Sequence, residues 1–187
     1  MDEAGRGPLA GPVVASAVIV RGRSISSPVR DSKLLTERQR ERAYAEILAN
    51  CRVGVGLAEP EEIDRINILQ ATLKAMQRAV AALDLIPSLL LVDGLHVPQG
   101  QLPAVPLVDG DARSYAISCA SIIAKVTRDR MMREYDTRYP GYGFAGHKGY
   151  GTRPHIEALK KLGPCPIHRR SFEPIRSLIP HGNPAHH

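Results

Sequence analysis

Acidic residues that follow apolar segments are the first feature of this sequence that could do chemistry. Asp93 comes directly after the apolar run 89–92, and a second run, 104–108, is followed by Asp109 and Asp111. Runs of this kind suit strands that helices cover on both faces. Because ligands of open α/β sheets bind beyond the carboxyl ends of the strands, we expect Asp93 and Asp111 to meet in one crevice. An Asp before a Gly is more often a simple turn residue, so only their joint placement points to a site.

Asp2 and Glu3 form another acidic pair, just before the glycine-rich turn 5–8 and the long apolar segment 12–20. We expect this pair to line the same crevice as Asp93 and Asp111. Clustered carboxylates raise one another's pKa unless a cation neutralises them, and hard oxygen ligands select Mg²⁺ or Mn²⁺. Two such ions about 4 Å apart can activate a water molecule and stabilise the leaving oxygen of a phosphodiester. The acids therefore point to metal-dependent phosphodiester hydrolysis.

Asp2 and Glu3 are neighbours in a predicted strand, so their side chains point to opposite faces. Both can aim at one ion only if the strand bends. We predict that Asp2 bridges the two metal ions, whereas Glu3 contributes peripherally or through its backbone carbonyl.

The elements that would hold these acids follow from the periodicity of the apolar residues. Alternating or continuous apolar runs predict strands at 12–20, 52–58, 89–92 and 104–108. Helical spacing predicts helices at 36–50, 61–83, 114–138 and 154–162. Thr36 and Gln39 have capping-box spacing, and the segment 61–83 is either one helix or two that break near Asn67. This order predicts a single α/β domain over residues 1–187, with a loop-rich, basic C-terminal extension at about 140–187.

Charge is unevenly distributed along the chain. The net charge is +6, yet residues 112–170 alone hold 12 Lys or Arg against 4 acids. A basic C-terminal half favours a polyanionic partner such as nucleic acid, although by itself a solvated basic face explains it equally well.

Composition indicates the class of protein and the cellular compartment in which it works. Hydrophobic residues make up 43% of the 187-residue chain, which is typical of a globular protein. No apolar run approaches the ~20 residues that cross a bilayer, and no secretory signal opens the chain. Cys51, Cys119 and Cys165 are widely spaced and odd in number, which argues against a disulfide framework and a Cys-type zinc site. We expect a cytoplasmic monomer with no membrane partner.

Seven blocks of sequence closely resemble bacterial ribonuclease HII, of the type 2 ribonuclease H family. They are 2–14 (DEAGRGPLAGPVV), 31–35 (DSKLL), 92–94 (VDG), 110–112 (GDA), 120–129 (ASIIAKVTRD), 147–152 (HKGYGT) and 166–172 (PIHRRSF). The resemblance covers essentially the full chain and implies a ribonuclease H-like fold, with a five-stranded mixed sheet flanked by helices. It implies an endoribonuclease that hydrolyses the RNA strand of RNA–DNA hybrids and cuts 5′ to single ribonucleotides in duplex DNA, leaving 3′-hydroxyl and 5′-phosphate ends. Its partners would be such nucleic acids, and its roles ribonucleotide removal and primer processing.

The resemblance also assigns the active site. It implies four catalytic, metal-binding acids, which fall on Asp2, Glu3, Asp93 and Asp111. These would hold two Mg²⁺ or Mn²⁺ ions, and Asp109 then becomes a turn residue.

Substrate recognition is implied for the glycine-rich turn and one tyrosine. Gly5, Arg6 and Gly7 match the family turn that recognises the ribose 2′-hydroxyl at the RNA–DNA junction. Glycines let backbone groups approach a sugar closely, and the 2′-hydroxyl distinguishes RNA from DNA. Tyr150 matches the family tyrosine that packs on the following deoxyribose. Without the resemblance, the turn would be interpreted as structural, and a half-buried core tyrosine would explain Tyr150 equally well.

Three basic residues are candidates for phosphate contacts, which position a duplex without reading its sequence. They are Lys33, Lys125 and Arg128. For each, a surface cation without such a contact is nearly as good an interpretation. We expect His147 and His168 to be structural or to contact the substrate backbone, because an oxygen-rich metal site needs neither.

One departure from the family pattern concerns the start of the first strand. Family members usually carry several apolar residues before the Asp–Glu pair, whereas only Met1 precedes it here. We therefore expect the strand that positions Asp2 to be short on its N-terminal side, with the α-amino group close by.

Two other interpretations stay open. The chain could be another nuclease or a transposase of the broader ribonuclease H-like superfamily, which cleavage of all-DNA duplex would favour. It could also be a basic nucleic-acid-binding module whose acids only form turns, which metal-independent binding without cleavage would favour.

Overall fold

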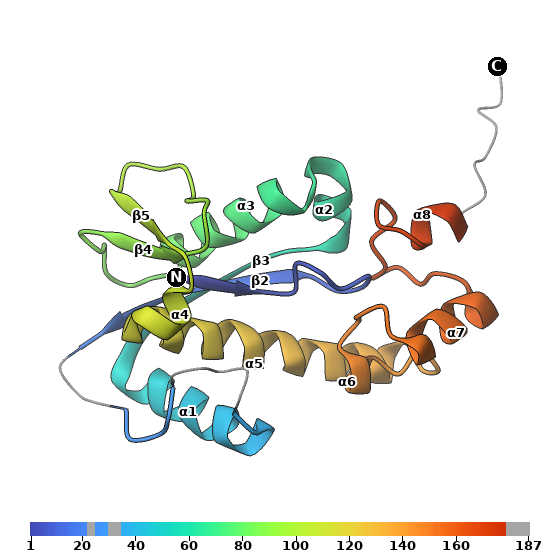
Figure 1. The fold of residues 1–187 in the computed structure, drawn as a ribbon, viewed down its shortest axis with the longest axis horizontal. Helices are drawn as coiled ribbons and strands as arrows, with labels where there is room; N and C mark the ends of the chain where they lie inside the picture. Colours follow the sequence, from blue (N-terminus) through green and yellow to red (C-terminus); the bar gives the residue numbers. More distant parts are fainter. Residues whose placement is uncertain (22–24, 30–34, 179–187) are drawn as a thin grey trace.

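Helices cover both faces of a central β-sheet in the computed structural model, which describes residues 1–21, 25–29 and 35–178 (Figure 1). The strands are β1 (Asp2–Ala4), β2 (Val13–Val20), β3 (Cys51–Ala58), β4 (Leu90–Asp93) and β5 (Ala104–Leu107). The helices are α1 (Glu37–Asn50), α2 (Pro60–Ile66), α3 (Ile68–Ala81), α4 (Gly110–Arg113), α5 (Tyr115–Arg138), α6 (Phe144–His147), α7 (Arg153–Leu162) and α8 (Ile175–Leu178). The predicted α/β class is confirmed.

The sheet consists of two parts that meet at Met1. Strands β1, β2 and β3 are antiparallel neighbours, and β4 pairs with β5 in parallel. The α-amino group of Met1 donates to the carbonyl of Leu91, and the N–H of Asp93 donates to the carbonyl of Met1. Five strands are present as expected, but they form a three-stranded and a two-stranded sheet, which the hydrogen bonds of Met1 link.

The two faces of the sheet carry different helices. Helix α3 packs on β2 and β3, where a Cβ on Gly54 or Gly56 would come within 2.2 Å of a carbonyl of α3. On the other face α5 packs on β1 and β2, and α1 lies outside α5 (Figure 1). Ser16 of β2 donates to the carbonyl of Ala120, so small residues let α5 approach the sheet closely, as its sequence predicts. The buried cores on both faces hold β1 and β2 in place.

Local signals explain where the helices begin. The capping box of α1 is confirmed, because the Thr36 hydroxyl accepts from Gln39 N–H and the Gln39 side chain accepts from Thr36 N–H. The segment 61–83 forms two helices that break at Asn67, whose φ is 67° and whose side chain caps α3. The sequence pattern does not predict α4, α6 or α8, because four residues are too few to show helical periodicity.

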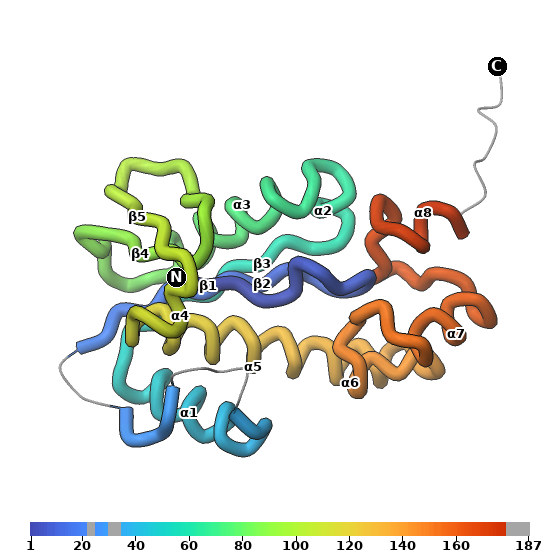
Figure 2. Tube along the Cα trace, in the orientation of Figure 1, coloured from blue at the N-terminus to red at the C-terminus, as the bar shows by residue number. Residues whose placement is uncertain are grey.

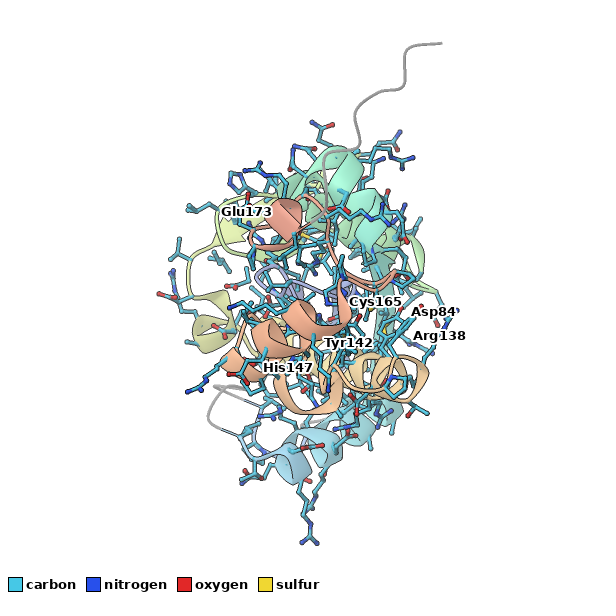
Figure 3. The ribbon with its side chains drawn as sticks, turned by 90° about the vertical axis from the view of Figure 1, so that its right-hand side faces the viewer. Asp84, Arg138, Tyr142, His147, Cys165 and Glu173 are labelled. Atoms are coloured by element: carbon cyan, nitrogen blue, oxygen red, sulfur yellow. The ribbon has the colours of Figure 1, made fainter. Side chains whose placement is uncertain are left out.

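Residues 139–178, the C-terminal segment, pack around Phe144 against the end of α5 (Figures 1 and 2). Backbone hydrogen bonds tie this segment to the chain between β1 and β2: Leu9 N–H donates to Gly149, and Gly11 N–H donates to Ile167. Figure 3 views this end of the molecule, where Tyr142, His147 and Cys165 are labelled. The segment thus reaches the turn that follows Asp2 and Glu3.

Two further expectations concern membrane-spanning helices and disulfide bonds, and both can be compared with the described residues. None of the helices in the described residues combines the length and apolar character needed to span a bilayer. Cys51, Cys119 and Cys165 are all free thiols, in agreement with the prediction that they form no disulfide framework.

Candidate active site

An open cleft of about 540 Å³ lies where β1 and the end of β4 face the middle of α5. All four predicted acids line it, together with the glycine-rich turn and Tyr150. Its lining residues are Asp2, Glu3, Ala4, Gly5, Arg6, Gly7, Arg40, Asp93, Asp111, Ser121, Lys125, Arg128 and Tyr150. Residues from six separate stretches of the chain therefore converge here.

Strand alternation sends the first two acids in different directions. The side chain of Ser121, on α5, donates a hydrogen bond to the buried carboxylate of Asp2. Glu3 also lines a smaller hollow beside Leu69, Thr72 and other residues of α3. Asp2 thus lies toward α5 and Glu3 toward α3, as expected for neighbours in a strand.

Asp93 and Asp111 come together through the start of α4. Asp93 ends β4, and its Oδ1 accepts from the N–H of Gly110 at 2.7 Å. The next residue, Asp111, lines the same cleft. Asp109 has a left-handed φ of 52° and is exposed outside the cleft, which is the geometry of a turn residue.

Burial makes the acidic cluster electrostatically costly. Desolvation, followed by the charges of Glu3 and Asp93, raises the pKa of the Asp2 carboxyl to about 7. Desolvation also raises the pKa of Glu3, although Arg6 opposes the shift from 3.2 Å. Burial lowers the pKa of the Met1 α-amino group to about 6, so this amine supplies little compensating charge at neutral pH.

The donor set of the cleft suits a hard divalent cation. Oε2 of Glu3 is buried without a hydrogen-bond partner, and the other acidic side chains of the cleft also offer only oxygen. Within residues 1–21, 25–29 and 35–178, however, no three Asp, Glu, His or Cys side chains are already arranged around one ion position. The cleft therefore offers suitable oxygen ligands for a metal ion, but their side chains are not yet arranged around one ion position.

The glycine-rich turn follows β1 and has no room for side chains at its first position. Gly5 has a φ of 95°, and a Cβ there would stand 2.1 Å from Nε of Arg128. A Cβ on Gly7 would lie 3.7 Å from Cε1 of Tyr150, so the turn and the tyrosine ring are in direct proximity. Tyr150 is 46% exposed and lines the cleft rather than forming part of the core.

The three candidate phosphate contacts are placed differently. Lys125 lines the cleft, is partly exposed and pairs with Asp129 at 2.8 Å. Arg128 also lines the cleft, but it is only 2% exposed and donates to the carbonyls of Pro12, Lys148 and Ala10. This geometry favours a structural task for Arg128, and its phosphate contact stays a prediction. Lys33 lies outside the described residues.

Three histidines of the C-terminal segment, His147, His155 and His168, lie outside the cleft, and two of them are hydrogen-bonded to each other. His155 Nδ1 donates to the carbonyl of Tyr150, and its Nε2 lies 3.0 Å from Nε2 of His168. His168 Nδ1 accepts from the N–H of Cys165, and His147 Nε2 donates to the carbonyl of Tyr142. His147 and His168 are therefore engaged with the protein backbone.

Three residues line the cleft or contact its glycine-rich turn, although the sequence analysis did not identify them as site residues. They are Ser121, Arg40 and Arg169. Ser121 carried a usable signal, because it lies four residues before Lys125 and so on the same helix face. Arg40 reaches the cleft from α1, and Arg169 reaches the glycine-rich turn from the C-terminal segment. No local pattern reveals such long-range approaches.

Comparison with known proteins adds the family. Residues 1–175 match the sequence model of the family described as Ribonuclease HII. The Ribonuclease HII of Maricaulis maris (strain MCS10) is 53% identical over 180 residues, covering 96% of this chain and 83% of that protein. The crystal structure of ribonuclease H2 from Pyrococcus horikoshii OT3 superposes with a TM-score of 0.78 at 30% identity, over 95% of this chain and 94% of that one. Bst-RNase HIII in complex with Mn²⁺ shares the fold, with a TM-score of 0.67 at 16% identity, over 95% and 67% of the two chains.

Proposed function

Because this chain belongs to the ribonuclease HII family, whose members are RNase H endonucleases acting on RNA–DNA, we propose that it also cuts duplex DNA 5′ to a single embedded ribonucleotide. The products would carry 3′-hydroxyl and 5′-phosphate ends. The observation that carries the proposal is the shared cleft, in which four acids lie beside the glycine-rich turn and Tyr150. The acids would serve hydrolysis, whereas the glycine-rich turn and Tyr150 would distinguish a ribose from the deoxyribose that follows it.

We propose that Asp2, Glu3, Asp93 and Asp111 hold two Mg²⁺ or Mn²⁺ ions. All four line the cleft, and Oε2 of Glu3 is a buried oxygen that lacks a partner. When bound, two such ions supply an activated water and stabilise the leaving oxygen of the phosphodiester. Cation binding would also oppose the desolvation and the charge repulsion that raise the pKa of Asp2. The acids would have to adjust their side chains, since no three of them are already arranged around one ion position within the described ranges.

The protein's own groups would select and orient the substrate. The turn at Gly5, Arg6 and Gly7 offers backbone groups to the 2′-hydroxyl, because no side chain at either glycine intervenes. Tyr150 stands beside Gly7 with its ring exposed, so a sugar at the turn would meet this ring next. A flat ring against that second sugar would reject an additional hydroxyl. Lys125, which is partly exposed in the cleft, would contact a phosphate.

The biological setting follows from this activity as part of the same proposal. Cutting beside a lone ribonucleotide would begin its removal from DNA, and cutting hybrids would help to process replication primers. We propose that the enzyme does this as a cytoplasmic monomer that meets nucleic acid but no membrane.

The test is cleavage of a matched set of duplexes with Mg²⁺ or Mn²⁺. The set contains one ribonucleotide in DNA, a uniform RNA–DNA hybrid, and an all-DNA duplex of the same sequence. We expect cleavage of the first two and none of the third. Equal cleavage of the all-DNA duplex would favour a general nuclease, and metal-independent binding without cleavage would favour a binding module.

A further inference from the structure

We propose that Arg169 is a positioning residue for the glycine-rich turn, and that its guanidinium sets the preference for a lone ribonucleotide over a uniform hybrid. This inference rests on the proposed function, because it concerns the same turn. Arg169 lies in the C-terminal segment, 163 residues after Arg6, and its side chain is completely buried.

Hydrogen bonds join this guanidinium directly to the turn. Nη1 donates to the carbonyl of Arg6 at 2.8 Å and Nη2 to the carbonyl of Gly5 at 2.5 Å. Nε and Nη2 also donate to the carbonyl of Gly11, at 3.0 and 2.8 Å. The planar fork therefore holds both ends of the loop that carries the turn, a geometry that a lysine ammonium cannot reproduce.

Holding these carbonyls also orients the N–H groups on the other side of each peptide. In a trans peptide the C=O and the following N–H point in opposite directions. The carbonyls of Gly5 and Arg6 point at Arg169, so the N–H groups of Arg6 and Gly7 point away from it, on the side where both residues line the cleft. Neither N–H has an acceptor within the described part of the chain. Two adjacent donors are thus held ready for a substrate oxygen.

Arg128 supports the same loop from α5 but does not contact the carbonyls of the turn. Its guanidinium donates to Ala10 and Pro12, and also to Lys148. The described hydrogen bonds of both guanidiniums are to carbonyls and none is to a carboxylate. Arg169 is therefore the group whose loss would free the peptides at Gly5 and Arg6 in particular.

A purely structural task for Arg169 has to be separated from positioning. Its backbone N–H donates to Leu9, so the residue also ties the C-terminal segment to the rest of the chain. A variant could lose activity only because this segment loosens. The matched control is Ile175→Ala, which removes a fully buried side chain from the same segment without touching the turn.

The experiment compares Arg169→Gln, Arg169→Lys and Ile175→Ala with the wild-type protein. We measure kcat/KM on the single-ribonucleotide duplex and on the uniform hybrid, with thermal unfolding of each variant. Arg169→Gln loses hydrogen bonds from a charged donor. It should therefore lower, about tenfold, the ratio of kcat/KM on the single-ribonucleotide duplex to kcat/KM on the uniform hybrid. Arg169→Lys should restore only part of the ratio, and it serves as the test if the glutamine variant does not fold. Ile175→Ala should lower the melting temperature and leave the ratio unchanged.

A second readout does not depend on activity. Amide hydrogen exchange at Arg6 and Gly7 should quicken in the Arg169 variants and stay at the wild-type rate in Ile175→Ala. An unchanged ratio together with unchanged exchange in both Arg169 variants would overturn the positioning role, as would an equal change of the ratio in Ile175→Ala. If the wild-type protein shows no preference at all, the proposed function fails, and amide exchange still decides whether Arg169 positions the turn.

Discussion

Oδ1 of Asp93 accepts a 2.7 Å hydrogen bond from the backbone N–H of Gly110. Asp93 ends β4 and Gly110 begins α4, so this bond sets the spacing between Asp93 and the next acid, Asp111. A Cβ on Gly110 would stand 3.0 Å from that oxygen and 2.7 Å from Cδ1 of Ile117. The close placement of Asp93 and Asp111 thus depends on Gly110, which has no side chain.

Substituting Gly110 by Ala should therefore damage the site more than the fold. The methyl group would push on the Asp93 carboxylate and on Ile117, and we expect cleavage to fall at least about tenfold with a stability loss of about 1–2 kcal/mol. Gly100→Ala is the matched control, since no atom lies within 4 Å of a Cβ there. Equal activity of the two variants, measured on RNA–DNA hybrid, would show that the Asp93–Gly110 contact is dispensable.

Substituting Asp2 by Asn should separate stability from activity. The folded-state pKa of Asp2 is raised from 3.8 to about 7, so stability of the metal-free protein is lost as the pH rises between these values, and the full loss is present above them. We expect Asp2→Asn to increase the free energy of unfolding by about 2 kcal/mol at pH 8 in EDTA. The same change should lower Mg²⁺-dependent cleavage at least ~100-fold, because it removes one of the carboxylates that would hold the metal ions.

Thermal unfolding with and without Mg²⁺ checks this prediction. Mg²⁺ should raise the melting temperature of the wild-type protein more than that of Asp2→Asn, since a ligand stabilises only the state that binds it. Asp109→Asn, which alters an exposed turn residue outside the cleft, should behave as wild type. Full Mg²⁺-dependent cleavage by Asp2→Asn would rule out the bridging role.

The meeting of Asp93 and Asp111 in one cleft could be predicted from the sequence because the signal of each acid is local. Asp93 ends an apolar run of strand length, and the rule that ligands bind at the carboxyl ends of strands then places it. Whether Asp109 or Asp111 joins it depends on a single turn of helix, which residue patterns do not reveal. That choice came from the resemblance, and the left-handed Asp109 is its structural explanation.

Acidification should destabilise the C-terminal segment through its histidines. Burial, followed by the charges of His155 and His147, lowers the pKa of His168 from 6.5 to about 4. The unfolded chain therefore binds more protons than the folded protein between these values, and the free energy of unfolding falls as the pH is lowered through this window. The hydrogen bond between the two Nε2 atoms of His155 and His168 needs one of them to be unprotonated.

Urea unfolding at pH 7 and pH 5 measures this effect. We expect the difference between the two pH values to shrink by about 2 kcal/mol in His168→Gln, because this variant has no imidazole to protonate there. His96→Gln, which alters an exposed histidine, should keep the wild-type pH dependence. A pH profile of His168→Gln parallel to that of the wild type would refute the assignment.

Tyr150 should govern which substrates are cleaved more than how fast. We expect Tyr150→Ala to lower kcat/KM on the single-ribonucleotide duplex about tenfold more than on the uniform hybrid, because the exposed ring stands beside Gly7. Tyr139→Ala is a control, as this tyrosine packs near the end of α5 and does not line the cleft. Unchanged preference in Tyr150→Ala would remove the ring from the recognition of the second sugar.

The supports of the site could not be predicted, since they come from distant parts of the chain. Arg169 donates to a turn more than 160 residues away, and Met1 links the two parts of the sheet. Both depend on tertiary packing and leave no periodic trace. For Arg128 the sequence offers only a basic residue, whereas the structure shows a guanidinium enclosed by backbone carbonyls.

Mapping the cut in an end-labelled DNA duplex with one ribonucleotide tests the central proposal most directly. With Mg²⁺ or Mn²⁺ we expect one cut, immediately 5′ to the ribonucleotide, leaving a 3′-hydroxyl on one fragment and a 5′-phosphate on the other. The product should disappear in EDTA and with Asp2→Asn. A cut on the 3′ side of the ribonucleotide would contradict the proposed recognition of the RNA–DNA junction. So would the absence of any cut while the uniform hybrid is still cleaved.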